Sequence, residues 1–160
     1  MDKDFDETDG EILRLIQEDF PLMERPFGEI AKRLDVHPKL DESEVMRRIE
    51  ALKESGVIRR VGAVIDGRAV GVVTTLLGAK VPAESIGAFS DVVNSYNRVT
   101  HNYLRDCERN IWFTIWGKSG DEIERTINEI RDKTGVTDIL SFPSKKTYKI
   151  RAVFDIPKQS

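Results

Sequence analysis

The sequence of 160 residues contains one cysteine, Cys107, and two histidines, His37 and His101. A single cysteine excludes a disulfide within the chain, and with it a disulfide-stabilised secreted scaffold or a cysteine-cluster zinc site. Two histidines also argue against a histidine-rich metal centre. No apolar run approaches the roughly 20 residues of a membrane span, and residues 1–7 are acidic, unlike the basic start of a signal peptide. We therefore expect a cytoplasmic protein.

The sequence also lacks the motifs of several common enzyme classes. It contains no glycine-rich phosphate loop, no Gly-x-Gly-x-x-Gly fingerprint and no Gly-x-Ser-x-Gly nucleophile elbow. The sequence therefore lacks the signature motifs of nucleotide hydrolases, dehydrogenases and serine hydrolases. Hydrophobic residues make up 39% and charged residues 33% of the chain, which is typical of a folded globular protein.

Three short helices are predicted at the start of the chain. Residues 8–11 have the spacing of a capping box, Pro26 suits the first position of a second helix, and Asp41 opens a third. Gly56 is a suitable stop for the third helix. Three helices with a tight turn before the last one indicate a helix-turn-helix, winged-helix-like domain over residues 1–57.

The second half of the sequence has the alternation of strands. From Val72 the predicted order is strand, helix, strand, strand, helix, strand, the split βαβ order of a ferredoxin-like sandwich. The expected fold is therefore α+β, with a βαββαβ domain over residues 58–160. The predicted strands and extended segments are residues 57–65, 72–81, 99–105, 111–116, 136–142 and 145–154.

The third predicted helix does not have the charge of a DNA-reading helix. It begins Asp41-Glu42-Ser43-Glu44, and its basic residues are Arg47, Arg48 and Lys53. Carboxylates in the first turn repel phosphates, whereas DNA binding depends on cations that face them. Residues 1–58 carry a net charge of −7, against +4 for the rest of the chain. The pattern argues against DNA binding and favours a structural or dimerising role.

The strand over residues 99–105 carries the chemically distinctive side chains. On a regular strand His101, Tyr103 and Arg105 share one face, beside Val99. Such polar groups are unusual on an inward strand face. A histidine moves protons near neutral pH or binds a metal, although a lone histidine is more often structural or merely exposed.

The following strand places Trp112, Thr114 and Trp116 on one face. Two interpretations stay open: the tryptophans flank a flat ligand, or they fill an interface between sheets of a dimer.

Basic residues gather at Arg59-Arg60 and again near the C-terminus. Alternation puts Lys145, Lys149 and Arg151 on one face of the last extended segment. A row of cations suits a ligand with several carboxylates, but lysines also protect solvated sheet edges. Both interpretations stay open.

The most specific motif is His101-Asn102-Tyr103-Leu104-Arg105, followed by Asn110-Ile111-Trp112-Phe113-Thr114. With Asp19-Phe20-Pro21-Leu22 and Arg59-Arg60-Val61-Gly62, it resembles the siroheme decarboxylases and the related proteins of heme d1 biosynthesis. These are an enzymatic branch of the Lrp/AsnC-type family of regulators, and the resemblance covers residues 6–155.

The resemblance implies a lyase subunit that removes carbon dioxide from two acetate side chains of siroheme, giving 12,18-didecarboxysiroheme. It implies no added organic cofactor, since the iron arrives with the substrate, and a heterodimer with a paralogous subunit. The tetrapyrrole is expected in the ferredoxin-like half. The alternatives are a transcriptional regulator that senses a small ligand or heme, and a heme-binding module without catalysis.

The resemblance also suggests roles for the residues singled out above. Decarboxylation leaves electron density at the side-chain carbon, which a proton must quench. We expect His101 to be that acid or an axial ligand to the substrate iron, Tyr103 to be its hydrogen-bond partner, and Trp112 to border the ring. Siroheme bears many carboxylates, so cations must bind them. The candidates are Arg59, Arg60, Arg105, Lys145, Lys149 and Arg151.

Overall fold

The computed structural model describes residues 5–151 and 153–156, which form two compact units. The helical unit contains the described residues up to Ala63 together with those from Ile150 onward, and the sheet unit is Val64–Lys149. The sequence-based division had placed all of residues 58–160 in the second domain. The difference arises because the C-terminal segment packs on the first helix, where Phe154 N–H donates to Gln17 Oε1 at 3.0 Å.

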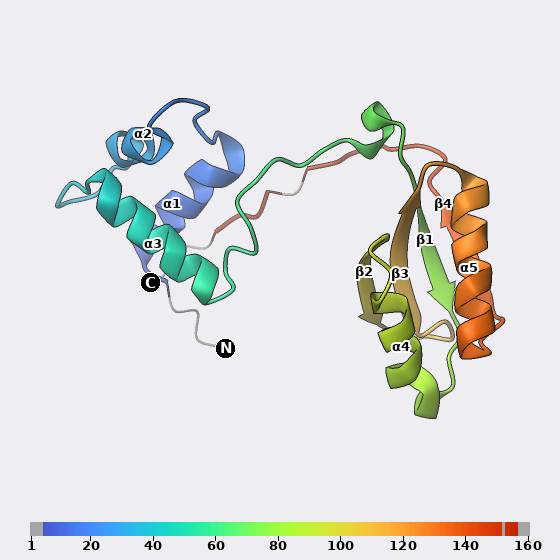
Figure 1. Cartoon of the computed structure of the whole chain (residues 1–160). Helices are drawn as coiled ribbons and strands as arrows, with labels where there is room; N and C mark the ends of the chain where they lie inside the picture. The colour runs from blue at the N-terminus through green and yellow to red at the C-terminus, as the bar shows by residue number, and fades with distance from the viewer. Residues whose placement is uncertain (1–4, 152, 157–160) are drawn as a thin grey trace. The chain divides into compact units, whose positions relative to one another are not determined.

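The helical unit contains α1 (Glu7–Glu18), α2 (Pro26–Arg33) and α3 (Glu42–Glu54) (Figure 1). Pro26 begins α2 and the Asp41 side chain caps α3, as the sequence predicts. The cap of α1 differs from the predicted capping box: Asp6 accepts from Asp9 N–H at 2.8 Å and Asp9 accepts from Asp6 N–H at 3.1 Å. Two aspartates close the same reciprocal bonds that Thr8 and Glu11 were expected to make.

Each helix turns one apolar stripe toward a shared core. Within each helix the spacing of these residues follows the helical period. The buried core residues of the unit are Phe5, Ile12, Leu13, Ile30, Ala31, Leu34, Val45, Ile49, Leu52 and Ile58.

The strand predicted over residues 57–65 is absent, although all of these residues are described. Gly56 takes a positive φ of 77° after α3, and the chain then runs without a neighbouring strand to pair with. Val64 and Ile65 are 88% and 71% exposed. Residues 145–151 likewise form no strand, so the expected alternation of Lys145, Lys149 and Arg151 on one face does not apply. β-branched residues favour strands only where a partner strand is available.

The sheet unit contains β1 (Val73–Ala79), α4 (Ile86–Asn94), β2 (Val99–Leu104), β3 (Ile111–Gly117), α5 (Gly120–Thr134) and β4 (Ile139–Pro143). Two short 3-10 turns, Gly67–Val70 and Ala83–Ser85, precede β1 and α4. The strands are antiparallel in the order β2-β3-β1-β4, and both helices pack on one face (Figure 1). This confirms the expected α+β, ferredoxin-like arrangement.

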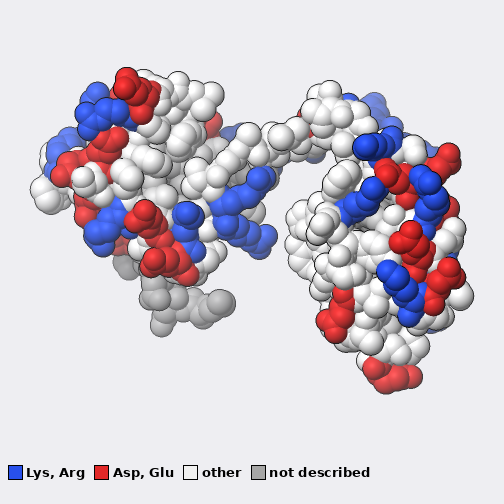
Figure 2. Space-filling model, viewed as in Figure 1, with Lys and Arg blue, Asp and Glu red and all other residues white. Residues whose placement is uncertain are grey.

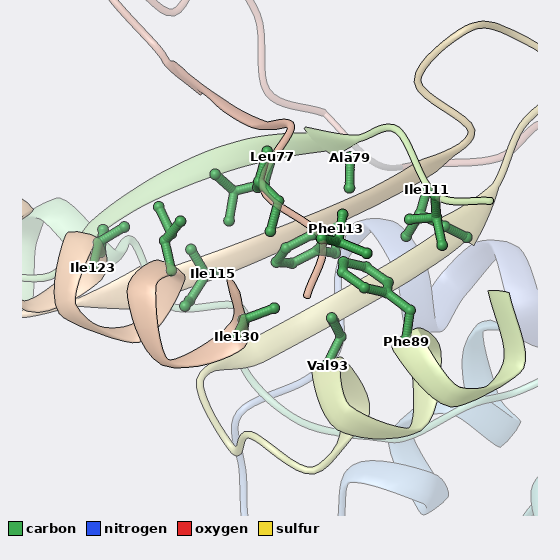
Figure 3. Close-up of a cluster of buried hydrophobic side chains, with 13 residues drawn as sticks. Leu77, Ala79, Phe89, Val93, Ile111, Phe113, Ile115, Ile123 and Ile130 are labelled. Atoms are coloured by element: carbon green, nitrogen blue, oxygen red, sulfur yellow. The ribbon is translucent and has the colours of Figure 1, made fainter. Parts of the chain in front are cut away.

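The core of the sheet unit lies between the sheet and its two helices (Figure 3). Phe113 of β3 and Phe89 of α4 meet edge to face with ring centroids 6.2 Å apart. Leu77 of β1 and Ile127 of α5 are also fully buried. Every second residue of β1 and β3 therefore points to the helices, and the residues between them point to the opposite face.

Candidate functional site

The sheet face opposite the helices has no covering element among the described residues of the sheet unit. We call it the open sheet face. Leu76, Tyr103, Leu140 and Phe142 are all more than 40% exposed on it, so it is a contiguous apolar and aromatic surface. Strand alternation and pairing assign to it Thr74, Leu76, Gly78, His101, Tyr103, Trp112, Thr114, Trp116, Leu140 and Phe142.

His101 and Tyr103 lie together on the open sheet face, as the sequence predicts. Their rings are stacked, with centroids 6.2 Å apart and planes 19° apart. His101 Nδ1 lies 3.0 Å from Thr100 Oγ1, so the expected hydrogen bond from Tyr103 is replaced by a stacking contact. The Thr100 contact occupies Nδ1 and leaves Nε2 for a ligand above the sheet.

Val99 does not share this face, because β2 has a bulge between Val99 and His101. Val99 is opposite Ile115, which is buried, and packs against the core. His101 is opposite Thr114. The extra residue of the bulge reverses the alternation, so the prediction that Val99 lies beside His101 is wrong, while the His101–Tyr103 pair is unaffected.

Trp112 is held flat against the open sheet face. A Cβ at Gly78 would lie 3.2 Å from the indole, so a larger residue at this position would crowd the ring. Trp112 Nε1 donates to the backbone oxygen of Arg109 at 2.5 Å. Phe142 of β4 is its ring neighbour, with centroids 5.5 Å apart. We call the two rings of Trp112 and Phe142 the aromatic floor; it lies next to the His101–Tyr103 pair.

Two other residues of the sequence motif lie at the β2–β3 turn. Asn110 bridges to Val81 with both ends of its amide: Oδ1 accepts from Val81 N–H at 2.9 Å and Nδ2 donates to Val81 O at 2.8 Å. Arg105 follows the end of β2, and its N–H donates to Asn110 O at 2.7 Å. Asn110 therefore has a structural role, and the Arg105 side chain is exposed at the edge of the sheet.

The other predicted cations do not belong to the strands that form the open sheet face. In the helical unit, Arg59 and Arg60 line a groove of about 930 Å³, and its apolar lining residues include Phe20. Arg151 of the same unit forms an ion pair with Glu18 at 3.1 Å. Lys145 and Lys149 follow β4 in irregular chain. Of the residues expected in the site, the structure brings His101, Tyr103 and Trp112 together on one surface.

Arg109 and Phe142 border the same surface and were not among the predicted site residues. Arg109 lies in a turn, where no periodicity indicates a direction for its side chain. The one sequence feature that could have pointed to Arg109 as a site residue was its position three residues before Trp112. Phe142 required knowledge that β4 pairs with β1, placing Phe142 opposite Leu76.

Two of the three basic residues of α3, Arg47 and Arg48, are paired with carboxylates of the same unit. Arg48 donates to Asp9 at 2.8 Å, Asp6 at 2.9 Å and Glu44 at 3.2 Å. Arg47 pairs with Glu44 at 2.6 Å. Figure 2 shows blue and red side chains intermingled over this unit rather than a basic stripe. Such pairing leaves few free cations for phosphates.

These pairs shift the pKa values of the groups involved. Burial alone would raise the pKa of Asp6, but the Asp9 and Thr8 backbone N–H groups and the Arg48 guanidinium outweigh it, so that pKa is lowered. Arg47, with Arg48, holds the pKa of Glu44 below its ordinary value. Both carboxylates are stabilised in the charged form.

Comparison with known proteins places this arrangement in a family. The model of the siroheme decarboxylase NirDL-like HTH domain matches residues 9–59, and that of the AsnC-like ligand binding domain matches residues 69–149. The siroheme decarboxylase alpha subunit of Desulfovibrio desulfuricans is 42% identical over 157 residues, which cover 98% of this chain and 88% of that protein. The chain belongs to the siroheme decarboxylase family. Membership supports an enzymatic role and confirms the resemblance drawn from the motif.

More distant siroheme decarboxylases also match nearly the whole of this chain. The NirG subunit of Paracoccus pantotrophus is 32% identical over 145 residues, covering 91% of this chain and 89% of that protein. The crystal structure of siroheme decarboxylase NirDL aligns with a TM-score of 0.65 and 27% identity over 96% of this chain and 48% of that chain. Escherichia coli AsnC has a TM-score of 0.75 at 18% identity, over 93% of this chain and 97% of that one, which shows a shared fold alone.

Two further properties concern membranes and metals. Among the described residues, no helix is both long and apolar enough to span a bilayer. The same residues contain no cluster of three His, Cys, Asp or Glu side chains suited to holding a metal ion.

Proposed function

We propose that the chain is a subunit of a siroheme decarboxylase, a carboxy-lyase that converts siroheme to 12,18-didecarboxysiroheme. The observation that carries this proposal is the His101–Tyr103 pair beside Trp112 on the open sheet face. It occurs in a chain that is 42% identical to siroheme decarboxylase alpha subunits. The reaction releases two molecules of carbon dioxide from acetate side chains and adds one proton at each remaining carbon.

The reaction needs a proton donor at the side-chain carbon. As carbon dioxide leaves, the electron pair of the broken carbon–carbon bond delocalises into the macrocycle until a proton arrives. His101 Nε2 is suited to supply that proton, because Thr100 occupies Nδ1. The same nitrogen suits axial ligation of the substrate iron, and the stacked Tyr103 fixes the imidazole plane in either role. No added organic cofactor is proposed, because the macrocycle itself accepts the electron pair.

The aromatic floor supports binding of a flat ligand. Trp112 and Phe142 lie side by side and offer dispersion contacts to a ring face. The carboxylates of the substrate require cations, for which Arg59, Arg60, Arg105, Lys145, Lys149 and Arg151 stay the candidates from sequence. We further propose that the reaction takes place in the cytoplasm, which agrees with the single exposed cysteine.

A paralogous subunit is proposed as the partner. The open sheet face carries Leu76, Leu140 and Phe142, each more than 40% exposed, and exposed apolar patches mark protein interaction sites. Relatives are named as alpha, NirG and NirDL subunits. A partner above the open sheet face encloses the tetrapyrrole and excludes water from the proton transfer.

The test is anaerobic incubation of the purified chain with siroheme, alone and with its paralogous subunit, followed by mass spectrometry of the extracted tetrapyrrole. Loss of two carboxyl groups is the expected result. Dependence on the second subunit shows where the site is completed. An unchanged tetrapyrrole in both mixtures contradicts the proposal and favours heme sensing or DNA binding.

A further inference from the structure

The open sheet face has a cation built into it that the sequence motif does not include. A Cβ at Gly78 would lie 3.2 Å from Arg109 Cδ, and equally close to the Trp112 indole. Gly78 points to the open sheet face, because its neighbours Leu77 and Ala79 are buried on the helix side. The aliphatic stem of Arg109 therefore crosses the open sheet face in contact with the sheet, beside Trp112.

The Arg109 guanidinium is held in one orientation. Its Nη2 donates to Asp138 Oδ1 at 2.8 Å, and the side chain is only 22% exposed. Asp138 immediately precedes β4, whereas Arg109 precedes β3. The ion pair thus joins segments at two strands of the sheet, which fixes the direction of the planar group.

The hydrogen-bonding capacity of Arg109 is largely unused. Asp138 is the one hydrogen-bond partner of its guanidinium among the described residues, and Nε is buried without an acceptor. A guanidinium carries five N–H donors, and a buried donor without an acceptor is costly. Carboxylates match this fork of donors, and the interaction strengthens next to apolar aromatic surface.

The cations expected from sequence differ from Arg109 in position. Arg151 is paired with Glu18 in the helical unit, and Lys145 lies in irregular chain after β4. Arg109 alone among these three combines a fixed guanidinium with contact to the aromatic floor. A tetrapyrrole whose ring lies on that floor brings its peripheral carboxylates to the level of this side chain.

We propose that Arg109 binds a peripheral carboxylate of the tetrapyrrole substrate on the open sheet face. Asp138 is its positioning residue, and Gly78 admits the Arg109 stem and the Trp112 ring together. The identity of the ligand rests on the proposed function, while the carboxylate chemistry rests on the geometry of Arg109.

The test is a spectrophotometric titration of the full-length chain, alone and with its paralogous subunit, using ferric uroporphyrin III as the probe. Arg109→Gln is expected to weaken binding about tenfold or more, as loss of a charged hydrogen bond does. Arg109→Lys keeps the charge and the stem but loses the planar fork, so a smaller loss of several-fold is expected. Arg125→Gln, at an exposed position of α5, is the matched control and should bind like wild type.

A second measurement separates a direct contact from a structural effect. With siroheme as substrate, Arg109→Gln should raise KM more than it lowers kcat, whereas a general loss of folding lowers the active fraction and leaves KM unchanged. Asp138→Asn keeps the cation and should give a smaller rise in KM. If Arg109→Gln does not fold, Arg109→Lys takes its place in both measurements.

The outcomes distinguish this proposal from the proposed function. Wild-type affinity in both Arg109 variants overturns the carboxylate contact. Tetrapyrrole binding that depends on Arg109, without any decarboxylation by the wild-type pair, overturns the proposed function and keeps the contact. Absence of probe binding by wild type in both mixtures overturns both.

Discussion

The two units differ in where their polar and apolar side chains lie. The helical unit buries the apolar stripes of three helices and pairs Arg47 and Arg48 with carboxylates of the same unit. The sheet unit buries one face of its sheet and leaves the other uncovered, with His101 and Tyr103 on it. The helical unit thus has Arg47 and Arg48 of α3 paired within itself, whereas His101 and Tyr103 lie on an exposed face of the sheet unit.

The largest effect is expected at His101. Replacing His101 with alanine removes the proposed proton donor and should lower the decarboxylation rate by about 10²–10⁴-fold, with tetrapyrrole binding retained. The measurement is product formation per minute from siroheme by mass spectrometry. His37→Ala, an exposed histidine of the helical unit, is the matched control and should leave the rate unchanged. Equal rates for both variants would remove His101 from the chemistry.

The two faces of the sheet should differ in their contribution to stability. Phe113 is fully buried between sheet and helices, so Phe113→Ala should lower the free energy of unfolding by about 3–5 kcal/mol. Phe142 is 44% exposed on the open sheet face, so Phe142→Ala should cost less than about 1.5 kcal/mol. Urea denaturation of the uncomplexed chain measures both. Similar losses would show that the open sheet face is already covered in solution.

The ion pairs of the helical unit should make a smaller, pH-dependent contribution. Arg48→Met removes the cation that pairs with Asp6 and Asp9, whereas Glu44 keeps Arg47, and should lower the free energy of unfolding by about 1 kcal/mol at pH 7. The pKa of Asp6 is lowered in the folded chain, in part by Arg48. The stabilisation from this pair is therefore present above the unfolded pKa and lost as pH falls through the lower folded pKa.

The difference between wild type and Arg48→Met should accordingly shrink as pH falls from 7 to 3. Denaturation series at pH 7, 5 and 3 test this sign. A difference that grows on acidification would contradict the assignment of these carboxylates as charged partners of Arg48.

The smallest expected effect is on DNA. The chain should give no salt-sensitive gel shift with mixed-sequence DNA at low salt, because Arg47 and Arg48 of α3 are paired with carboxylates and the first turn of α3 is acidic. A control regulator of the AsnC fold should shift under the same conditions. Clear binding that weakens as salt rises would show that the helical unit still acts as a DNA reader.

Local periodicity was sufficient to predict which way a side chain faces wherever that direction depends only on the helix or strand that carries the residue. The buried faces of α3 and α5 follow the helical period, and the pairing of His101 with Tyr103 on one face follows from strand alternation. Periodicity failed at Val99, where one inserted residue reversed the alternation. It also failed over residues 57–65, where suitable strand residues have no strand to pair with.

The sequence by itself determined the order of the three N-terminal helices and of the βαββαβ elements, the acidic start of α3 and the motif that identifies the family. Only the tertiary structure decided which cations accompany the aromatic floor. Arg109 reaches that surface because the turn before β3 directs its stem over Gly78 and because Asp138 lies across the sheet to hold it. These contacts join residues about 30 positions or more apart, and no local pattern encodes such a distance.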